Sequence, residues 1–92
     1  QEAGASLLVI ECVPAVLAAE ITAALAIPTI GIGAGPHCDG QVLVSYDMLG
    51  ITPRRPLFCH NFLAEAGNVR EAFHRYGAAV RTSTFPGPEH TY

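Results

Sequence analysis

The segment Ser6–Glu11 constrains the fold of this chain most, because an unbroken apolar run, Leu7–Ile10, ends there in a carboxylate. A short run that is apolar on both faces is typical of a parallel strand covered by helices on both sides. We therefore expect Ser6–Glu11 to form such a strand, with Glu11 at its carboxyl end. Parallel α/β enzymes place their active sites at that end of the strands.

A helix and a second strand are expected next. Apolar residues recur at every fourth position, at Leu17, Ile21 and Leu25, and this spacing predicts a helix. We expect Pro14 at its first position and its end before Pro28, because proline disfavours helical geometry in the residue before it. Residues 29–33 then predict a short strand that runs into a glycine-rich loop, 31–36.

The second half of the chain predicts two helices and a third strand. Asp39 is a candidate N-cap for a helix that ends at Gly50 and has an apolar face made of Val42, Leu43, Tyr46 and Leu49. Leu57–Cys59 is a candidate strand. Asn68 and Glu71 resemble a capping box, and the helix behind them has a continuous apolar face: Val69, Ala72, Phe73, Tyr76 and Val80.

Strands and helices thus alternate, which predicts a parallel α/β structure. Three βα units cannot close a (β/α)₈ barrel, which takes about 250 residues. The chain is therefore either a small open sheet or the C-terminal part of a barrel. It has no initiator methionine, and we expect the second: one partial barrel domain over residues 1–92, with an irregular tail at 82–92.

Composition excludes several classes of function. The net charge is −3, and the basic residues are five arginines without a lysine, so we expect no nucleic-acid partner. The apolar runs are shorter than the roughly 20 residues that span a bilayer, so we expect no membrane insertion. Three widely spaced cysteines, Cys12, Cys38 and Cys59, predict a reducing, cytoplasmic setting without disulfides, with Cys12 and Cys59 buried.

Glu11 is the leading candidate for chemistry. Partial burial at a strand end favours a carboxylate that acts as a general base near neutral pH. The alternative is a structural glutamate that pairs with an arginine or caps a helix.

Other chemical groups favour structural roles. The glycine loop lacks the spacing of a nucleotide-binding loop, and its glycines predict a tight turn with close backbone approach to a ligand. The four histidines have no metal-ligand spacing: His37, His60, His74 and His90. We expect Asp47 to be exposed rather than paired with Arg54 or Arg55, and Tyr46 and Tyr76 to be core residues.

Five motifs occur in an order that resembles one enzyme family. They are Glu11–Pro14 (ECVP), Ile30–Pro36 (IGIGAGP), Asp39–Val44 (DGQVLV), Asp47–Gly50 (DMLG) and Phe85–His90 (FPGPEH). Together they resemble the C-terminal part of the ketopantoate hydroxymethyltransferases (3-methyl-2-oxobutanoate hydroxymethyltransferases), over essentially the whole chain.

The resemblance implies a fold and a reaction. The fold is the last three βα units of a (β/α)₈ barrel. The reaction transfers a hydroxymethyl group from 5,10-methylenetetrahydrofolate to the keto acid 3-methyl-2-oxobutanoate, giving 2-dehydropantoate in pantothenate and coenzyme A biosynthesis. Mg²⁺ polarises the keto acid's carbonyl, and the glutamate of the ECVP motif, here Glu11, is the proton acceptor.

The resemblance also implies what this chain lacks. The family's magnesium-binding carboxylates and substrate-binding lysine would lie upstream, so the chain alone should be inactive, and the full-length enzyme should be a homo-oligomer. Tyr46 and His60 depart from residues common in the family. Two other readings remain open: a related metal-dependent keto-acid lyase or mutase, and a non-catalytic remnant that acts as an interaction module.

Overall fold

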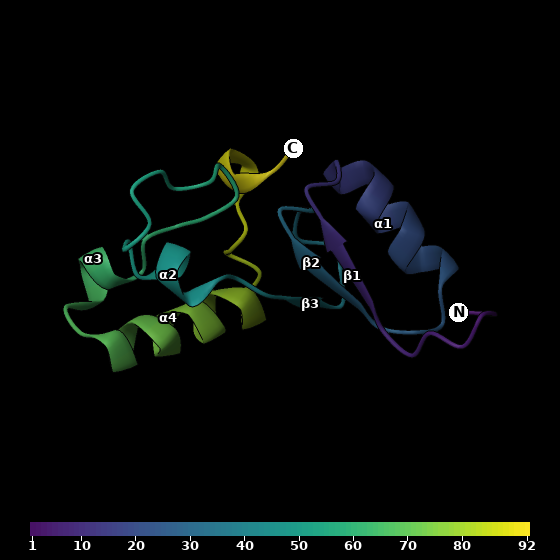
Figure 1. The fold of residues 1–92 in the computed structure, drawn as a ribbon, viewed down its shortest axis with the longest axis horizontal. Helices are drawn as coiled ribbons and strands as arrows, with labels where there is room; N and C mark the ends of the chain where they lie inside the picture. Colours follow the sequence, from purple (N-terminus) through teal and green to yellow (C-terminus); the bar gives the residue numbers. More distant parts are fainter.

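A computed structural model describes all residues, 1–92, and contains a three-stranded parallel sheet (Figure 1). The strand β1 (Leu8–Glu11) pairs with β2 (Thr29–Ile32), so that Leu8 lies opposite Thr29 and Glu11 opposite Ile32. The two-residue strand β3 (Gly40–Gln41) pairs with the other edge of β2. The predicted parallel α/β architecture is confirmed.

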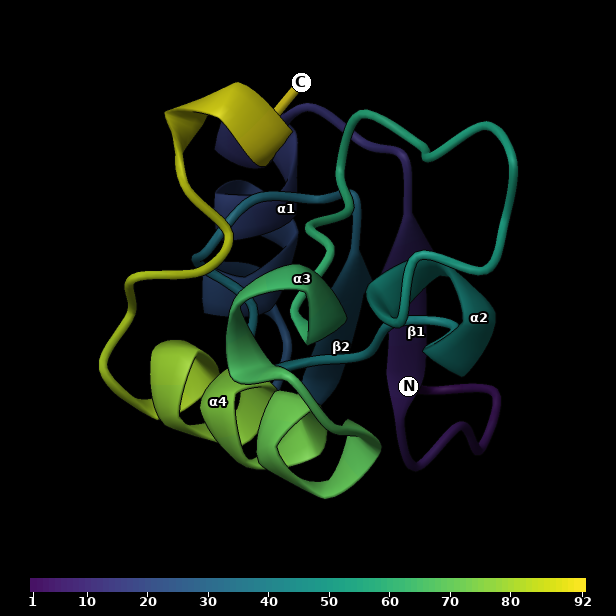
Figure 2. The ribbon, with the colours of Figure 1, turned by 90° about the vertical axis from the view of Figure 1, so that its left-hand side faces the viewer.

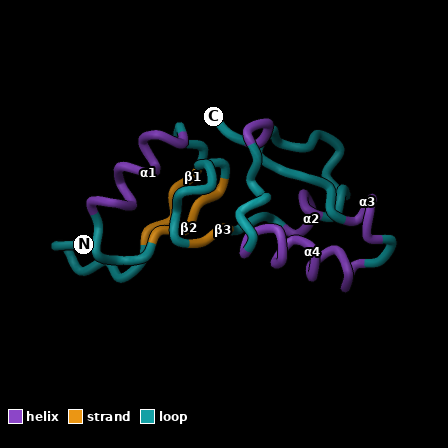
Figure 3. The backbone as a smooth tube through the Cα atoms, turned by 180° about the vertical axis from the view of Figure 1, so that it is seen from behind, coloured by secondary structure: helices purple, strands orange, loops and turns teal.

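The helix α1 (Ala15–Ala24) covers one face of the sheet (Figure 3). Its buried Ala18 packs in a small apolar cluster with Ile10 of β1 and Ala34 of the glycine loop. The opposite face is less covered, and Val9 is 55% exposed. The prediction that β1 is covered on both faces is therefore wrong for these residues, because no second helical layer lies over Val9.

The remaining helices form a separate C-terminal half around a larger core (Figure 1), and Figure 2 views the molecule from the end of this half. They are α2 (Ser45–Met48), α3 (Leu63–Ala66), α4 (Val69–Arg81) and the 3₁₀ turn η1 (Pro88–His90). Three aromatic rings, Phe62, Tyr76 and Phe85, pack edge to face at its centre, with ring centroids 5.4–5.9 Å apart. The molecule is elongated, 44 × 23 × 23 Å, because this core and the α1 cluster lie side by side.

The predicted helix from Asp39 to Gly50 is wrong in its first half. The Asp39 carboxylate does not cap a helix but accepts a hydrogen bond from the Thr29 backbone N–H at 2.8 Å. This bond holds the next residues against β2, and the Val42 N–H donates to the Gly31 carbonyl at 3.0 Å. Leu43 is buried between exposed Val42 and Val44, which is the alternation of a strand.

The predicted strand at Leu57–Cys59 is also wrong. The Cys59 N–H donates to the Pro56 carbonyl at 3.1 Å, so the chain turns there instead of extending. Phe58 and Cys59 are buried all the same, in the larger core. Their apolar character reflects packing from a turn rather than a place in the sheet.

Helix α4 begins where its sequence predicted. The Asn68 side chain accepts a hydrogen bond from the Glu71 N–H at 2.9 Å, which satisfies a free donor of the first turn. The apolar face is only partly buried: Ala72 is fully buried, whereas Val69 and Phe73 stay 48% and 44% exposed. None of the helices has both the length and the apolar composition that a membrane span requires.

Candidate active site

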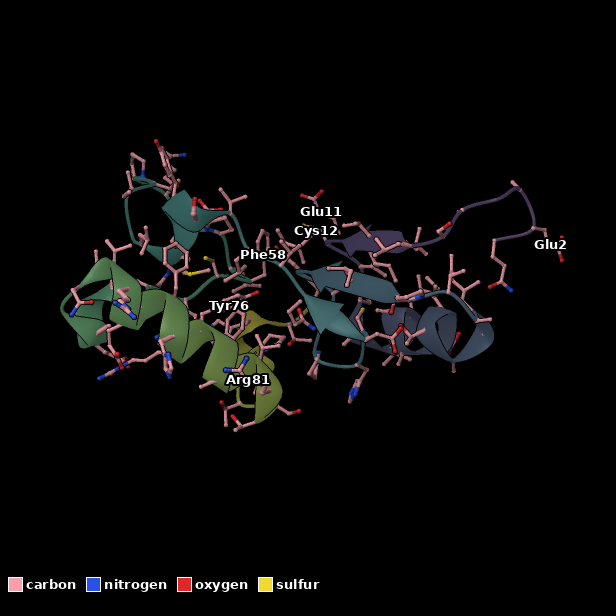
Figure 4. The ribbon with its side chains drawn as sticks, turned by 90° about the horizontal axis from the view of Figure 1, so that it is seen from below. Glu2, Glu11, Cys12, Phe58, Tyr76 and Arg81 are labelled. Carbon is pink, nitrogen blue, oxygen red and sulfur yellow. The ribbon has the colours of Figure 1, made fainter.

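The direction of the Glu11 side chain follows from the pleat of β1. Neighbouring residues of a strand point to opposite faces, and Ile10 packs against α1. Glu11 therefore projects from the face away from α1, at the carboxyl end of β1 (Figure 4). Its cross-strand partner Ile32 packs against the core of the C-terminal half, so Glu11 lies at the end of the sheet nearest to that half (Figure 4).

Glu11 is exposed, in contrast to the partial burial that we expected. The sheet face from which it projects lacks a covering layer, and nothing encloses the carboxylate. The alternative role as the partner of an arginine receives no support, since the three ion pairs of the structure join other residues. The carboxylate is thus free to contact a ligand.

The residue after Glu11 has an unusual backbone. Cys12 has a φ of 52°, in the left-handed region that residues other than glycine rarely occupy. Its N–H donates to the Ile32 carbonyl at 2.9 Å, one rung beyond the paired residues of β1 and β2. The chain thus reverses its direction immediately after the candidate base. Sequence reasoning did not find this feature, because no sequence signal marks a left-handed cysteine.

The glycine loop makes the predicted tight turn, and its close approaches are to side chains of this chain. Gly33 has a φ of +68°, and a β-carbon there would lie 2.8 Å from Cδ2 of Phe58. A β-carbon on Gly35, whose φ is +79°, would lie 2.5 Å from the β-carbon of Ala15. The glycines therefore let Phe58 and the start of α1 pack tightly at the carboxyl end of β2.

The three cysteines are free and differ in exposure. Cys59 is buried as predicted, and burial, followed by the charge of Asp47, raises the pKa of its thiol. Cys12 is exposed, so the prediction that it is buried is wrong. It lies in the turn beyond β1, outside the apolar cluster that α1 covers.

The predictions for Tyr46, Tyr76 and Asp47 have different outcomes. Tyr46, in α2, is 63% exposed, so the prediction that it is a core residue is wrong. Tyr76 belongs to the core, as predicted; its buried hydroxyl has no hydrogen-bond partner, and burial raises its pKa. Asp47 is half-buried and pairs with neither arginine, since it accepts a hydrogen bond from the Thr52 hydroxyl at 2.6 Å.

His60 and His90 lie together in the C-terminal half, with ring centroids 5.9 Å apart. The Nδ1 atom of His90 accepts a hydrogen bond from the Gly87 N–H at 3.1 Å. Burial lowers the pKa of His90, and nearby Glu89 partly opposes this effect. Sequence reasoning missed this pair because the two histidines are thirty positions apart in the chain.

The chain's own residues do not fit a metal site. No group of three or more His, Cys, Asp or Glu side chains is close enough to hold an ion. Mg²⁺ is bound by several oxygen ligands in a nearly octahedral arrangement. Glu11 is the single carboxylate at the carboxyl end of β1 and does not supply such a set of ligands by itself.

Comparisons with known proteins point to one family. The family model described as ketopantoate hydroxymethyltransferase matches residues 1–88. A 3-methyl-2-oxobutanoate hydroxymethyltransferase of Thiobacillus denitrificans is 60% identical over 92 residues, which are 100% of this chain and 35% of that protein. Proteins of the same name from Xanthomonas campestris and Methylococcus capsulatus are 59% and 60% identical over 99% of this chain and 34% of each relative. The chain therefore spans about a third of the length of these relatives.

Proposed function

The chain belongs to the ketopantoate hydroxymethyltransferase family, and from this membership we propose that it is the part of such an enzyme that carries the catalytic base. The proposed reaction converts 3-methyl-2-oxobutanoate, 5,10-methylenetetrahydrofolate and water into 2-dehydropantoate and tetrahydrofolate. The proposed setting is cytoplasmic pantothenate biosynthesis.

One observation carries the assignment of the base. Glu11 ends a parallel strand and projects from the face opposite the covering helix α1. In a (β/α)₈ barrel the helices lie outside, so the face opposite the helix lines the barrel interior, and the carboxyl strand ends form the active-site mouth. A free carboxylate there is positioned to accept a proton from a bound substrate.

In the proposed step, the Glu11 carboxylate takes the proton from C3 of the keto acid. The electron pair of the broken C–H bond forms an enolate, and C3 then bonds to the methylene carbon of the folate. Both bonds from that carbon to folate nitrogens break, and water supplies the hydroxyl oxygen of the product. The C3 proton and one water proton end on the two nitrogens, which balances the reaction.

The barrel is part of the proposal, and the sheet supports it. The outer edges of β1 and β3 have no partner strand in this chain, and unpaired edges favour pairing with further strands. Val9 is 55% exposed on the same face as Glu11. Further strands of the family's longer chain would close the barrel and cover this face. We also propose, from family membership, a homo-oligomeric assembly.

Magnesium is proposed as the enzyme's metal, with ligands outside these residues. A divalent ion supplies positive charge where negative charge develops on a substrate oxygen. Because this chain does not fit a magnesium site, none of its residues is assigned as a ligand.

The test uses the full-length enzyme that contains this chain. We expect Glu11→Gln to abolish formation of 2-dehydropantoate, while calorimetry shows keto-acid binding within about threefold of wild type, since the amide has nearly the same shape. Glu2→Gln, an exposed carboxylate near the chain start, is the matched control and should keep full activity. Product formed at the wild-type rate by Glu11→Gln would refute the assignment. Turnover without methylenetetrahydrofolate would favour a lyase or mutase instead.

A further inference from the structure

The connection between β1 and α1 leaves one residue at which the chain can turn. Only Cys12, Val13 and Pro14 separate the strand from the helix. The ring of Pro14 fixes its φ, observed at −53°, and a residue before proline, here Val13, is restricted to extended geometry. The reversal therefore falls on Cys12, with its φ of 52°.

A comparison within the chain shows that this conformation is not the ordinary left-handed residue that follows a helix. Ser83 is the other non-glycine residue with a positive φ, 58°, but it follows the end of α4, and its N–H donates to the Val80 carbonyl. Left-handed residues are common after helices. Cys12 instead follows a strand, where a left-handed residue is exceptional. Strained residues of this kind cluster at functional sites.

The strained residue is anchored on both sides. The Cys12 N–H is held by the Ile32 carbonyl at 2.9 Å, and the Pro14 carbonyl accepts the Ala18 N–H of α1 at 3.0 Å. Glu11 is paired with Ile32 immediately before the turn. The left-handed turn lets the chain cross to the α1 side while Glu11 stays on the open side. A residue that resists positive φ would rotate the peptide after Glu11 and displace its side chain.

We propose that Cys12 is a positioning residue that acts through its backbone conformation and not through its thiol, aiming the Glu11 carboxylate at the substrate. The thiol is exposed, and no hydrogen bond to it accounts for the turn. This inference rests on the proposed function, since it gives Cys12 a role only if Glu11 is the base.

The experiment compares variants of the full-length enzyme that differ in their tolerance of positive φ. Gly and Asn accept the left-handed region, whereas β-branched Val resists it. We expect Cys12→Gly and Cys12→Asn to keep kcat within about threefold. We expect Cys12→Val to lower kcat by on the order of 100-fold, the effect of a small displacement of a catalytic group. The KM for the keto acid should stay within about threefold in all three. Ser83→Val is the matched control, with similar strain and unchanged kcat.

Three results would overturn the inference. The first is a loss of kcat of more than about tenfold in both Cys12→Gly and Cys12→Asn, which would make the thiol essential. The second is an unchanged kcat in Cys12→Val. The third is a loss of kcat in Ser83→Val as large as that in Cys12→Val. If Cys12→Val does not fold, the kcat of Cys12→Asn is the deciding measurement, because this variant removes the thiol but tolerates the left-handed turn. Glu11→Gln is assayed in parallel. If Glu11→Gln keeps its activity, the assignment of Glu11 as the base is refuted. If Glu11→Gln is inactive but Cys12→Val keeps the wild-type kcat, only the inference about Cys12 is refuted.

Discussion

The ring of Phe58 lies against Gly33, so closely that a β-carbon on the glycine would come within 2.8 Å of Cδ2 of the ring. Phe58 belongs to the core of the C-terminal half, and Gly33 follows directly after β2. This contact joins the two halves of the molecule beside the carboxyl ends of the strands. It fixes the C-terminal half relative to the strand pair that carries Glu11.

We predict that Gly33→Ala destabilises the full-length enzyme by two additive effects. The positive φ of Gly33 strains an alanine, at a cost of about 1–3 kcal/mol, and overpacking against Phe58 adds about 1–3 kcal/mol. Gly67→Ala is the control, because Gly67 has a φ of +82° and open space around its missing β-carbon. Urea unfolding should show a larger loss for Gly33→Ala. Equal losses would mean that Phe58 moves away without cost.

We predict that the Asp39 carboxylate is needed to hold β3 on the sheet. It accepts from the N–H of fully buried Thr29 at 2.8 Å. Asp39→Ala leaves that donor unpaired, which costs about 1–3 kcal/mol, whereas Asp39→Asn keeps an acceptor oxygen and should lose less. Urea unfolding of the full-length variants measures both. An Asn variant as unstable as the Ala variant would contradict this account.

We predict that the folded protein loses stability in mild acid because His90 is partly buried. Burial lowers its pKa in the folded state below the ordinary value of 6.5, and His60 and Arg55 act in the same direction, against Glu89. As pH falls below 6.5, the unfolded chain binds the proton first, so the free energy of unfolding decreases. The contribution of His90 is complete above pH 6.5 and is lost as pH falls through its lowered pKa.

The measurement is urea unfolding of the full-length protein between about pH 7.5 and about pH 5.5, the range in which histidine titrates. His90→Asn should flatten this pH dependence, since an amide oxygen can accept the Gly87 N–H without titrating. The exposed His74 provides the control, and His74→Asn should retain the wild-type slope. A wild-type slope in His90→Asn would show that other groups cause the dependence.

Local sequence signals predicted local structure well. The Asn68 cap forms as predicted because its hydrogen bond reaches only three residues along the chain. Helix α1 ends at Ala24, before Pro28, as the local restriction that proline imposes on its predecessor requires. The apolar run of β1 was recognised because its pattern needs no distant partner.

The failures came from contacts between distant residues. Asp39 was predicted to cap a helix, but its carboxylate binds the backbone N–H of Thr29, ten residues earlier in the chain. Phe58 is buried in a turn, where it packs against Gly33. The sequence predicted a strand there, because an apolar turn this short shows no periodicity that distinguishes it from a short strand. Cys12 was expected to be buried because it follows an apolar run, but the reversal after β1 places it at the surface.

We propose that Glu11 removes a proton from carbon, and hydrogen exchange measures that step without the folate. The full-length enzyme, incubated with Mg²⁺ and 3-methyl-2-oxobutanoate in deuterated water, is followed by proton NMR at C3. We expect wild type and Glu2→Gln to exchange this hydrogen, and we expect Glu11→Gln to bind the keto acid without exchange. Exchange at the wild-type rate in Glu11→Gln would show that another group removes the proton.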